Sequence, residues 1–280
     1  MYNAATKLIA GAVCVLAITS CNSESESARA ARLLYEEAGK ANLAGEPVRA
    51  IALLDSLKNN YPAETEWQRA SMKLRPTLII NASDEQIRAV DDSLLVLEQE
   101  HNCLQAKMKV ISNKQLVEPY YVDAASYDAQ FMNTTGIQPR VSTIGQMYFL
   151  SSANGGSLKH TGFTITCDGE SVQGGPIAYD GELNYRIDGS EIVTYPAEQS
   201  DAIGAFVKAH QGSPMTLTLT GAKNKSMKLT PKQVDAIVNC YDYSHTIMDA
   251  RQFAFEKERL NRQLDIARSQ AERLAGQSDD

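Results

Sequence analysis

Four acidic side chains near glycines in the middle of the chain are the first candidates for chemistry. They are Asp168, Glu170, Asp180 and Glu182. Two carboxyl groups that face each other across a sugar perform glycoside hydrolysis, one as the acid and one as the base or nucleophile. Aspartate beside glycine is also typical of tight turns, for reasons of backbone conformation. We expect turns here, and we keep a carbohydrate-active or peptidoglycan-processing enzyme as the alternative function.

An aromatic-rich stretch, VEPYYVDAASYDAQF, indicates binding instead of catalysis. It contains Tyr120, Tyr121 and Tyr127. Tyrosine rings stack on sugars or anchor a protein partner, because they offer a large contact area for little lost rotamer freedom. We predict that these three residues bind a partner, with the alternative that the rings fill the core of their own domain.

The common catalytic signatures are absent from the sequence. It contains no GxSxG, SxxK or HExxH motif, no glycine-rich phosphate loop and no dinucleotide-binding fingerprint. The four histidines are scattered singly and no CxxC pair occurs, which argues against a metal site. We predict no catalytic residue, no cofactor and no metal. The net charge of −7, without a Lys/Arg cluster, also argues against nucleic acid as a partner.

The beginning of the chain has the layout of an export signal. Lys7 precedes an apolar run over residues 8–18, which is about half the ~20 residues that a membrane-spanning helix needs. The run ends in Ile-Thr-Ser-Cys, which resembles the lipobox of bacterial lipoproteins. That resemblance implies cleavage before Cys21 and attachment of lipid to its thiol. We predict a signal peptide over 1–20, lipidation of Cys21 and a polar tether over 21–27, with an ordinary signal peptide as the alternative.

The residues after Cys21 bear on where the protein resides. Their sequence, NSESES, weakly resembles the acidic stretch that directs lipoproteins of Bacteroidetes to the cell surface. We predict a lipid anchor in the bacterial outer membrane, and we favour the periplasmic face over the cell surface. The expected partners are the membrane, through that anchor, and an unknown envelope protein or glycan.

The first folded segment reads as a helical hairpin over 28–76, extended by a third helix that ends before Pro76. Small and apolar residues recur at helical spacing on both sides of Gly45, which marks the turn. The pattern over residues 31–64 resembles one tetratricopeptide unit, two antiparallel helices of about 34 residues. No second copy follows, and a plain helical hairpin explains the pattern equally well.

Two long helices are predicted on either side of a central module. The first begins at a capping box formed by Ser83 and Gln86 and extends over 84–112, with apolar residues three and four apart. The second begins at another capping box, Thr230 with Gln233, and its apolar line includes Met248. We predict that the segments 77–114 and 230–276 form an antiparallel stalk, in which His101 makes a hydrogen bond within the seam. The predicted apolar seam of the first helix consists of Ile87, Val90, Leu94, Leu97, His101, Leu104, Met108 and Ile111.

Residues 115–229 read as a β-rich module with one helix. Short runs rich in Val, Ile, Thr, Tyr and Phe alternate with glycine-containing turns, which is typical of antiparallel strands. The stretch EQSDAIGAFVKAH has helical spacing. The predicted fold class is therefore α+β, with the module inserted between the two stalk helices and carrying its own core.

The remaining cysteines, Cys103, Cys167 and Cys240, are odd in number, and their pairing is left open. Cys103 falls away from the stalk seam, which argues against a bridge to Cys240. The Asp-Ser-Leu sequences at residues 55–57 and 92–94 match a short O-glycosylation pattern, although their helical setting argues against this use.

The order of these segments is similar to that of uncharacterised lipoproteins of Bacteroidales. The resemblance rests on LLDSLKNNYP, DDSLL, the β-rich region and the long last helix, and it implies no activity. We therefore predict a lipid-anchored scaffold or partner-binding protein of the cell envelope.

Overall fold

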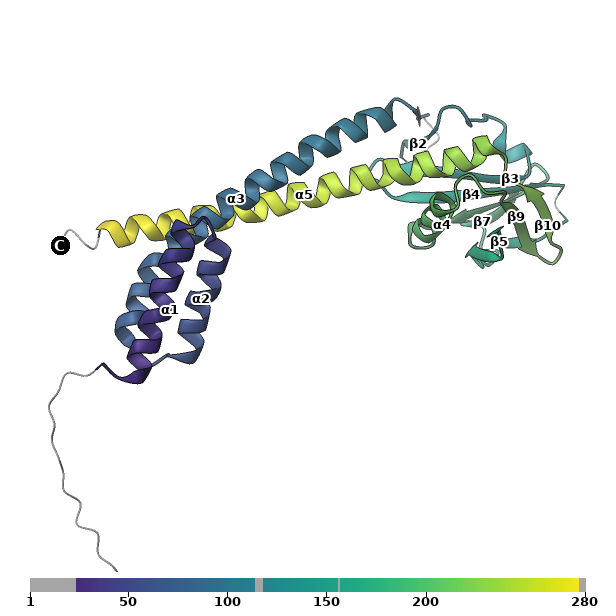
Figure 1. The fold of residues 1–280 in the computed structure, drawn as a ribbon. Helices are drawn as coiled ribbons and strands as arrows, with labels where there is room; N and C mark the ends of the chain where they lie inside the picture. Colours follow the sequence, from purple (N-terminus) through teal and green to yellow (C-terminus); the bar gives the residue numbers. More distant parts are fainter. Residues whose placement is uncertain (1–23, 114–117, 156, 277–280) are drawn as a thin grey trace, which may run out of the picture. The chain divides into compact units, whose positions relative to one another are not determined.

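The computed structural model describes residues 24–113, 118–155 and 157–276, and the predicted signal peptide with Cys21 lies outside them. The predicted α+β class is confirmed: helices lie toward both ends of the chain, with an antiparallel β module between them (Figure 1). Contacts divide the described chain into two compact units. The first unit consists of the described residues within 1–82 and within 264–280. The second unit consists of the described residues within 83–263.

The first unit contains the predicted helical hairpin. Helices α1 (Glu26–Leu43) and α2 (Pro47–Asn60) are joined at Gly45, whose φ of 76° favours glycine. Small side chains let the helices pack closely, and Ser25 caps α1 by accepting a hydrogen bond from the N–H of Ala28 at 2.9 Å. The helix thus begins inside the predicted tether. The hairpin shares its core with the third helix, and this core consists of Ala38, Ala41, Ala50, Leu54 and Leu78.

The third helix is longer than predicted and includes the first part of the predicted stalk helix. Helix α3 (Thr65–Gln105) continues through Pro76 and Ser83, where we predicted an end and a new start. Pro76 removes only one helical hydrogen bond, and the turns on either side remain intact. The Ser83 hydroxyl is buried and has no hydrogen-bond partner among the described residues, so it does not act as a cap there. The helix also ends earlier than the predicted residue 112.

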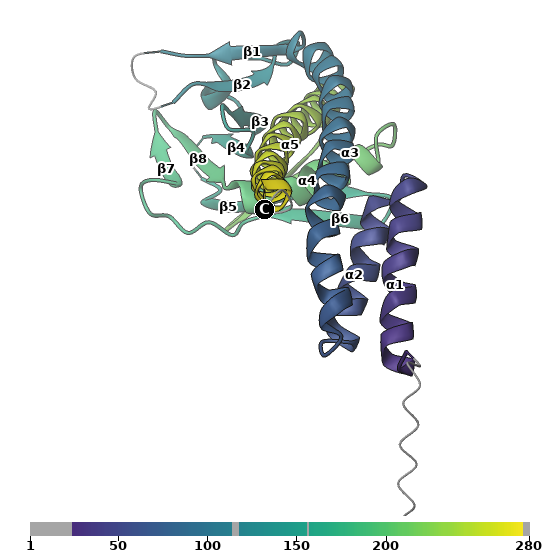
Figure 2. The ribbon, with the colours of Figure 1, turned by 90° about the vertical axis from the view of Figure 1, so that its left-hand side faces the viewer.

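The second unit contains two antiparallel sheets. Their orders are β1-β2-β3-β4-β8-β7 and β10-β9-β5-β6, and Figure 2 shows the first strands of the larger sheet one below another. The strand bounds are β1 (Met108–Ile111), β2 (Tyr120–Asp123), β3 (Gly136–Ser142), β4 (Met147–Asn154), β5 (His160–Cys167), β6 (Glu170–Gly174), β7 (Asn184–Ile187), β8 (Ser190–Tyr195), β9 (Thr216–Gly221) and β10 (Lys225–Lys228).

Three helical elements accompany these strands. They are the 3₁₀ turn η1 (Phe131–Asn133), α4 (Ala197–Ala209) and α5 (Pro231–Gly276). The start of α5 has the predicted capping box: the N–H of Thr230 donates to Gln233 Oε1 at 2.9 Å, and the N–H of Gln233 donates to Thr230 Oγ1 at 3.3 Å. The helix predicted from EQSDAIGAFVKAH is α4.

The core of the module is not its own, contrary to our prediction. One hydrophobic cluster includes residues of both sheets and α4 together with Leu104 of α3 and the beginning of α5. Cys240 and Tyr243 of α5 are almost completely buried in it, and Figure 1 shows the sheets and α4 gathered at the start of α5. Met248, which we placed on the buried line, is exposed. The first turns of α5 therefore complete the module.

Within the second unit, α3 and α5 pair in antiparallel order, as predicted. Successive contacts join Asp91 with Lys257 (Oδ1 to Nζ, 2.5 Å) and His101 with Thr246 (Nδ1 to Oγ1, 3.0 Å), and just after α3 Lys107 contacts Asn239. His101 also stacks on Tyr243, with ring centroids 5.0 Å apart. The interpretation of His101 as a hydrogen-bonded seam residue is thus confirmed. The predicted seam residues of α3 are half-buried or buried.

We expect Tyr243→Ala to destabilise the second unit by about 3–5 kcal/mol, because it empties a site at the centre of the shared core. Phe255→Ala on the same helix is the matched control and should change stability by about 0.5 kcal/mol or less, since Phe255 is 71% exposed. Urea unfolding of both variants measures the difference. Equal effects would show that α5 does not belong to the core of the module.

Candidate functional site

The structure places the three predicted tyrosines in three different settings. Tyr120 and Tyr121 are neighbours on β2, so their side chains point to opposite faces of the sheet. Tyr121 packs against the core and meets Tyr243 edge-on at 5.1 Å. The ring of Tyr127 lies 3.9 Å from Lys109 Nζ. Two surface hollows are described below. Of the three tyrosines, only Tyr120 belongs to the lining of either one.

Tyr120 belongs to a half-exposed cluster around Arg140 on the outer face of the larger sheet. The guanidinium lies 4.4 Å from the centre of the Tyr120 ring, and the Tyr120 ring lies 6.5 Å from that of Tyr148. Burial raises the pKa of Tyr148, and the positive charge of Arg140 opposes that rise. Arg140 Nε donates to Gln138 Oε1 at 2.9 Å. Among the described residues no carboxylate forms an ion pair with Arg140.

A depression of about 360 Å³ opens beside this cluster. Its lining combines aromatic rings, hydroxyl groups, an amide and two carboxylates, and it is set by the ends of β2, β3 and β8 and the start of α4. Such a mixture of apolar surface and a few polar groups is typical of ligand sites. The lining residues are Glu118, Pro119, Tyr120, Ser142, Gln146, Tyr148, Thr194, Pro196, Ala197 and Glu198.

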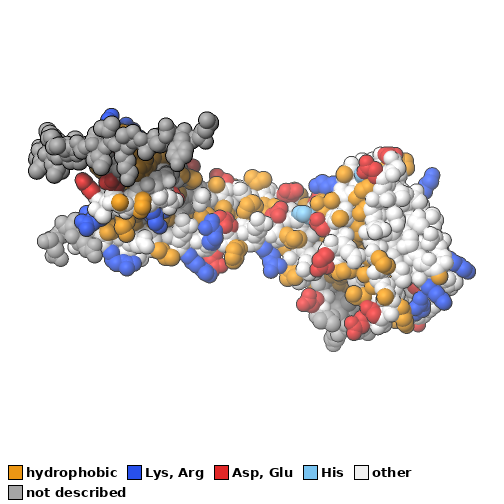
Figure 3. All heavy atoms as spheres, turned by 90° about the horizontal axis from the view of Figure 1, so that it is seen from below, with side chains coloured by type: hydrophobic (Ala, Val, Ile, Leu, Met, Phe, Trp, Pro, Cys, Tyr) orange, Lys and Arg blue, Asp and Glu red, His pale blue; other side chains and the backbone are white. Residues whose placement is uncertain are grey.

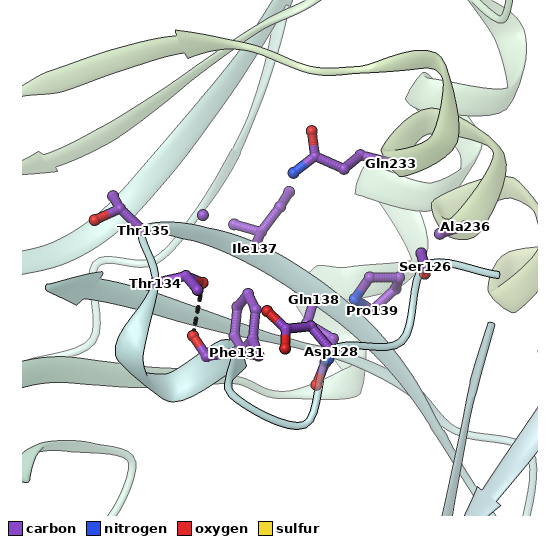
Figure 4. Close-up of a pocket in the computed structure, with 11 residues that line it drawn as sticks. Ser126, Asp128, Phe131, Thr134, Thr135, Ile137, Gln138, Pro139, Gln233 and Ala236 are labelled. Carbon is purple, nitrogen blue, oxygen red and sulfur yellow. Dashed lines mark hydrogen bonds between the residues drawn. The ribbon is translucent and has the colours of Figure 1, made fainter. Parts of the chain in front are cut away.

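A second, smaller pocket of about 180 Å³ lies between β3 and the start of α5 (Figure 4). It forms because β2 pairs only with the end of β3, at Val141 and Ser142, and leaves the first part of β3 without a partner on that side. Its lining residues are Ser126, Asp128, Phe131, Thr134, Thr135, Gly136, Ile137, Gln138, Pro139, Gln233 and Ala236. The aromatic-rich stretch identified in the sequence therefore contributes to both hollows.

The aromatic-rich stretch, which includes β2 and continues toward η1, is held in place by hydrogen bonds, one of them to α5. Asp123 accepts from the N–H of Ser126 at 2.8 Å and from Asn239 Nδ2 at 3.0 Å. Lys107 in turn donates to Asn239 Oδ1 at 3.1 Å. The polar contacts thus connect the segment to α5 and to the residues just after α3. No local pattern predicts this network, because its members are far apart in the chain.

A buried network in the core has the connectivity of a serine hydrolase triad, which no motif in the sequence predicts. Ser151 Oγ lies 2.8 Å from His160 Nε2, and His160 Nδ1 lies 3.0 Å from Glu191 Oε2. Tyr195 Oη is 3.0 Å from Ser151 Oγ. These are the nucleophile, base and orienting carboxylate of acyl transfer in their usual order.

Burial argues against catalysis by this network. Ser151, His160, Glu191 and Tyr195 all have an exposure of 0%, and the serine points between the sheets, where no substrate carbonyl can reach it. Burial lowers the pKa of His160, with the Glu191 contacts opposing the effect. For Glu191 burial alone raises the pKa, but hydrogen bonds from His160 and from the N–H of Lys159 outweigh it and lower the pKa. We interpret the network as a polar connection between strands β4, β5 and β8.

The four acidic candidates lie in or beside turns. Asp168 and Gly169 have positive φ in the hairpin between β5 and β6, which is typical of a two-residue turn. Asp180 accepts hydrogen bonds from the N–H groups of Asn184 and Glu182, which lower its pKa. The positions of Asp168 and Asp180 are thus explained by backbone geometry, as expected. Glu170 is exposed and reaches His210 at 3.5 Å.

The other sequence expectations give no further site. Cys103 is exposed whereas Cys167 and Cys240 are buried, and all three are free thiols; burial raises the pKa of Cys240 to about 12. In residues 24–113, 118–155 and 157–276, no three His, Cys, Asp or Glu side chains are grouped as metal ligands. None of the helices in the described chain combines the length and the apolar character needed to cross a membrane.

Exposed apolar side chains also occur on the paired helices of the second unit. Leu95, Val96 and Phe255 are all more than half exposed. On the face seen in Figure 3, however, hydrophobic side chains are interspersed with acidic and basic ones. This mixture does not indicate a particular partner.

Comparison of the chain with protein-family models, with curated proteins and with solved structures finds no match.

We expect the His160 network to make stability depend on pH. Because burial lowers the pKa of His160, the unfolded chain takes up a proton below about pH 6.5 that the folded chain does not. Stability should fall between pH 7 and pH 5, at no more than about 1.4 kcal/mol per pH unit from this group. Glu191 adds a loss below pH 4.5, since its pKa is lowered.

The urea midpoint measured from pH 7 to pH 5 tests this expectation. His160→Gln should lower stability at pH 7 by about 1–3 kcal/mol and flatten the pH dependence. His245→Gln, at a partly exposed position beside Asp201, is the control and should retain the slope. An unchanged slope in His160→Gln would contradict the assignment.

Proposed function

We propose that the protein is a lipid-anchored lipoprotein of the bacterial outer membrane that binds an envelope component through its β module. The lipobox at Cys21 supports the anchor, and the depression at Tyr120 supports the binding role. Periplasmic exposure is favoured over display on the cell surface. In this proposal the helices carry the module, and no chemical reaction takes place on it.

The observation that carries the proposal is the half-exposed cluster of Tyr120, Arg140 and Tyr148. Aromatic and arginine side chains of this kind dominate the binding energy of many interfaces. The core does not need them, because the buried face of the same strands already packs against α5. An arginine without a carboxylate partner retains donors for a ligand.

The alternative function is a carbohydrate-active or peptidoglycan-processing enzyme. Such an enzyme needs two catalytic groups that converge on an accessible site. The depression does contain two carboxylates, Glu118 and Glu198. No histidine, cysteine or lysine is among its lining residues. The balance of these observations favours binding.

We expect Tyr120→Ala to reduce capture of the envelope component at least about tenfold, because loss of an aromatic anchor costs about 2 kcal/mol or more. The measurement uses a photo-crosslinking amino acid at Gln146, an exposed residue that lines the depression, in intact cells. Tyr127→Ala is the matched control, since Tyr127 lies outside the lining and should leave the adduct unchanged.

An adduct that survives Tyr120→Ala in full would refute the assignment of the depression. Tyr121→Ala serves a different purpose, because Tyr121 packs on the core and its loss should lower stability. Conversion of a purified glycan or peptide that depends on Glu118 or Glu198 would establish the enzyme alternative.

We expect Cys21→Ser to abolish processing by the lipoprotein peptidase, because that cleavage requires the lipid-modified cysteine. The variant should carry no label from a radioactive fatty acid and should leave the outer-membrane fraction. Normal maturation of Cys21→Ser would replace the lipid anchor with an ordinary signal peptide.

A further inference from the structure

The pocket shown in Figure 4 has no role in the proposed function. It shares no lining residue with the depression at Tyr120, although Arg140 of the Tyr120 cluster donates to Gln138 of this pocket. Gln233 lies on one side of it, and Asp128 and Phe131 lie on the other. Its volume of about 180 Å³ suits one small ligand or one unit of a chain.

The loop that forms one wall is held in place before any ligand arrives. Ser152 Oγ donates to the carbonyl of Met132 at 2.8 Å, and Asn154 Nδ2 donates to the carbonyl of Asn133 at 2.6 Å. Thr134 Oγ1 donates to the carbonyl of Phe131 at 2.7 Å. Because the loop is already ordered in the free protein, binding of a ligand loses little free energy to ordering it.

The two glutamines of the pocket present donors. The side-chain oxygen of Gln138 accepts from Arg140 Nε at 2.9 Å, and that of Gln233 accepts from the N–H and hydroxyl of Thr230. These partners fix the orientation of both amides and leave their NH₂ groups without a partner in the described chain. Gln138 is only 7% exposed, and Gln233 Nε2 lies 3.9 Å from where a Cβ on Gly136 would stand.

Asp128 supplies the opposite kind of group. Its Oδ1 accepts from the N–H of Gln130 at 2.8 Å, and its other oxygen has no partner among the described residues. A carboxylate oxygen accepts and cannot donate while it is ionised. Beside it, the half-buried ring of Phe131 provides an apolar face.

These groups together define the ligand. An ammonium ion has donors only and would face the NH₂ group of Gln233, whereas a phosphate or carboxylate has acceptors only and would face Asp128. No cationic side chain lines the pocket; Arg140 and Lys225 contact Gln138 and Thr135 from outside the lining. Neighbouring hydroxyl groups donate and accept at once, and the C–H face of a sugar ring can stack on phenylalanine. We propose that this pocket binds a single neutral sugar unit.

Gln233→Glu tests the proposal with little disturbance of the fold. Glutamate keeps the oxygen that Thr230 uses, and it suits the start of a helix as well as glutamine does. It removes the NH₂ donor from the pocket. Binding of methyl glycosides of glucose, galactose, mannose and N-acetylglucosamine to the full chain is measured by saturation-transfer NMR, with lysine and phosphate as further probes.

At least one glycoside should bind the unmodified chain, with at least tenfold lower affinity for Gln233→Glu and for Asp128→Asn. Gln146→Glu, which alters the other hollow, should bind as well as the unmodified chain. Failure of every glycoside to bind, equal binding by Gln233→Glu, or displacement of the glycoside by lysine or phosphate would each overturn the proposal. None of these results affects the crosslinking test at Gln146.

Discussion

Burial of the first turns of α5 is the constraint on which the second unit depends. Both sheets and α4 share one apolar cluster with this helix, and Cys240 and Tyr243 lie inside it. The same turns carry Asn239, which contacts Asp123, and Gln233, which lines the small pocket. Core packing and the geometry of the surface sites therefore have one physical origin, and loss of the helix would remove both.

The module also shows why geometry alone does not identify an enzyme. Its best arrangement of nucleophile, base and carboxylate, around His160, lies where substrate cannot enter. Buried polar groups must be paired, and a Ser-His-Glu chain pairs all of its members. The accessible hollows have a different composition, with rings, amides and carboxylates, which suits recognition of a ligand more than attack on it.

Much of the fold could be predicted from local patterns, because caps, turns and apolar spacing act over a few residues. The Thr230 cap and the Gly45 turn are examples. Ser83 misled the prediction, since packing of a continuous helix outweighed a local capping signal. The sites were harder to predict. That Tyr120 and Tyr121 point to opposite faces follows only once β2 is known to be a strand. His160 contacts Ser151 and Glu191 only because the two sheets pack against each other.

The most direct test of binding without catalysis follows the tyrosine rings by NMR in the full chain. The protein has twelve tyrosines, and selective ¹³C labelling with single substitutions assigns the relevant ones. On addition of fractionated envelope extract, the signals of Tyr120 and Tyr148 should shift, those of the buried Tyr195 and Tyr243 should not, and the ligand should be recovered unchanged. Perturbation of Tyr195 together with formation of a product would contradict this account.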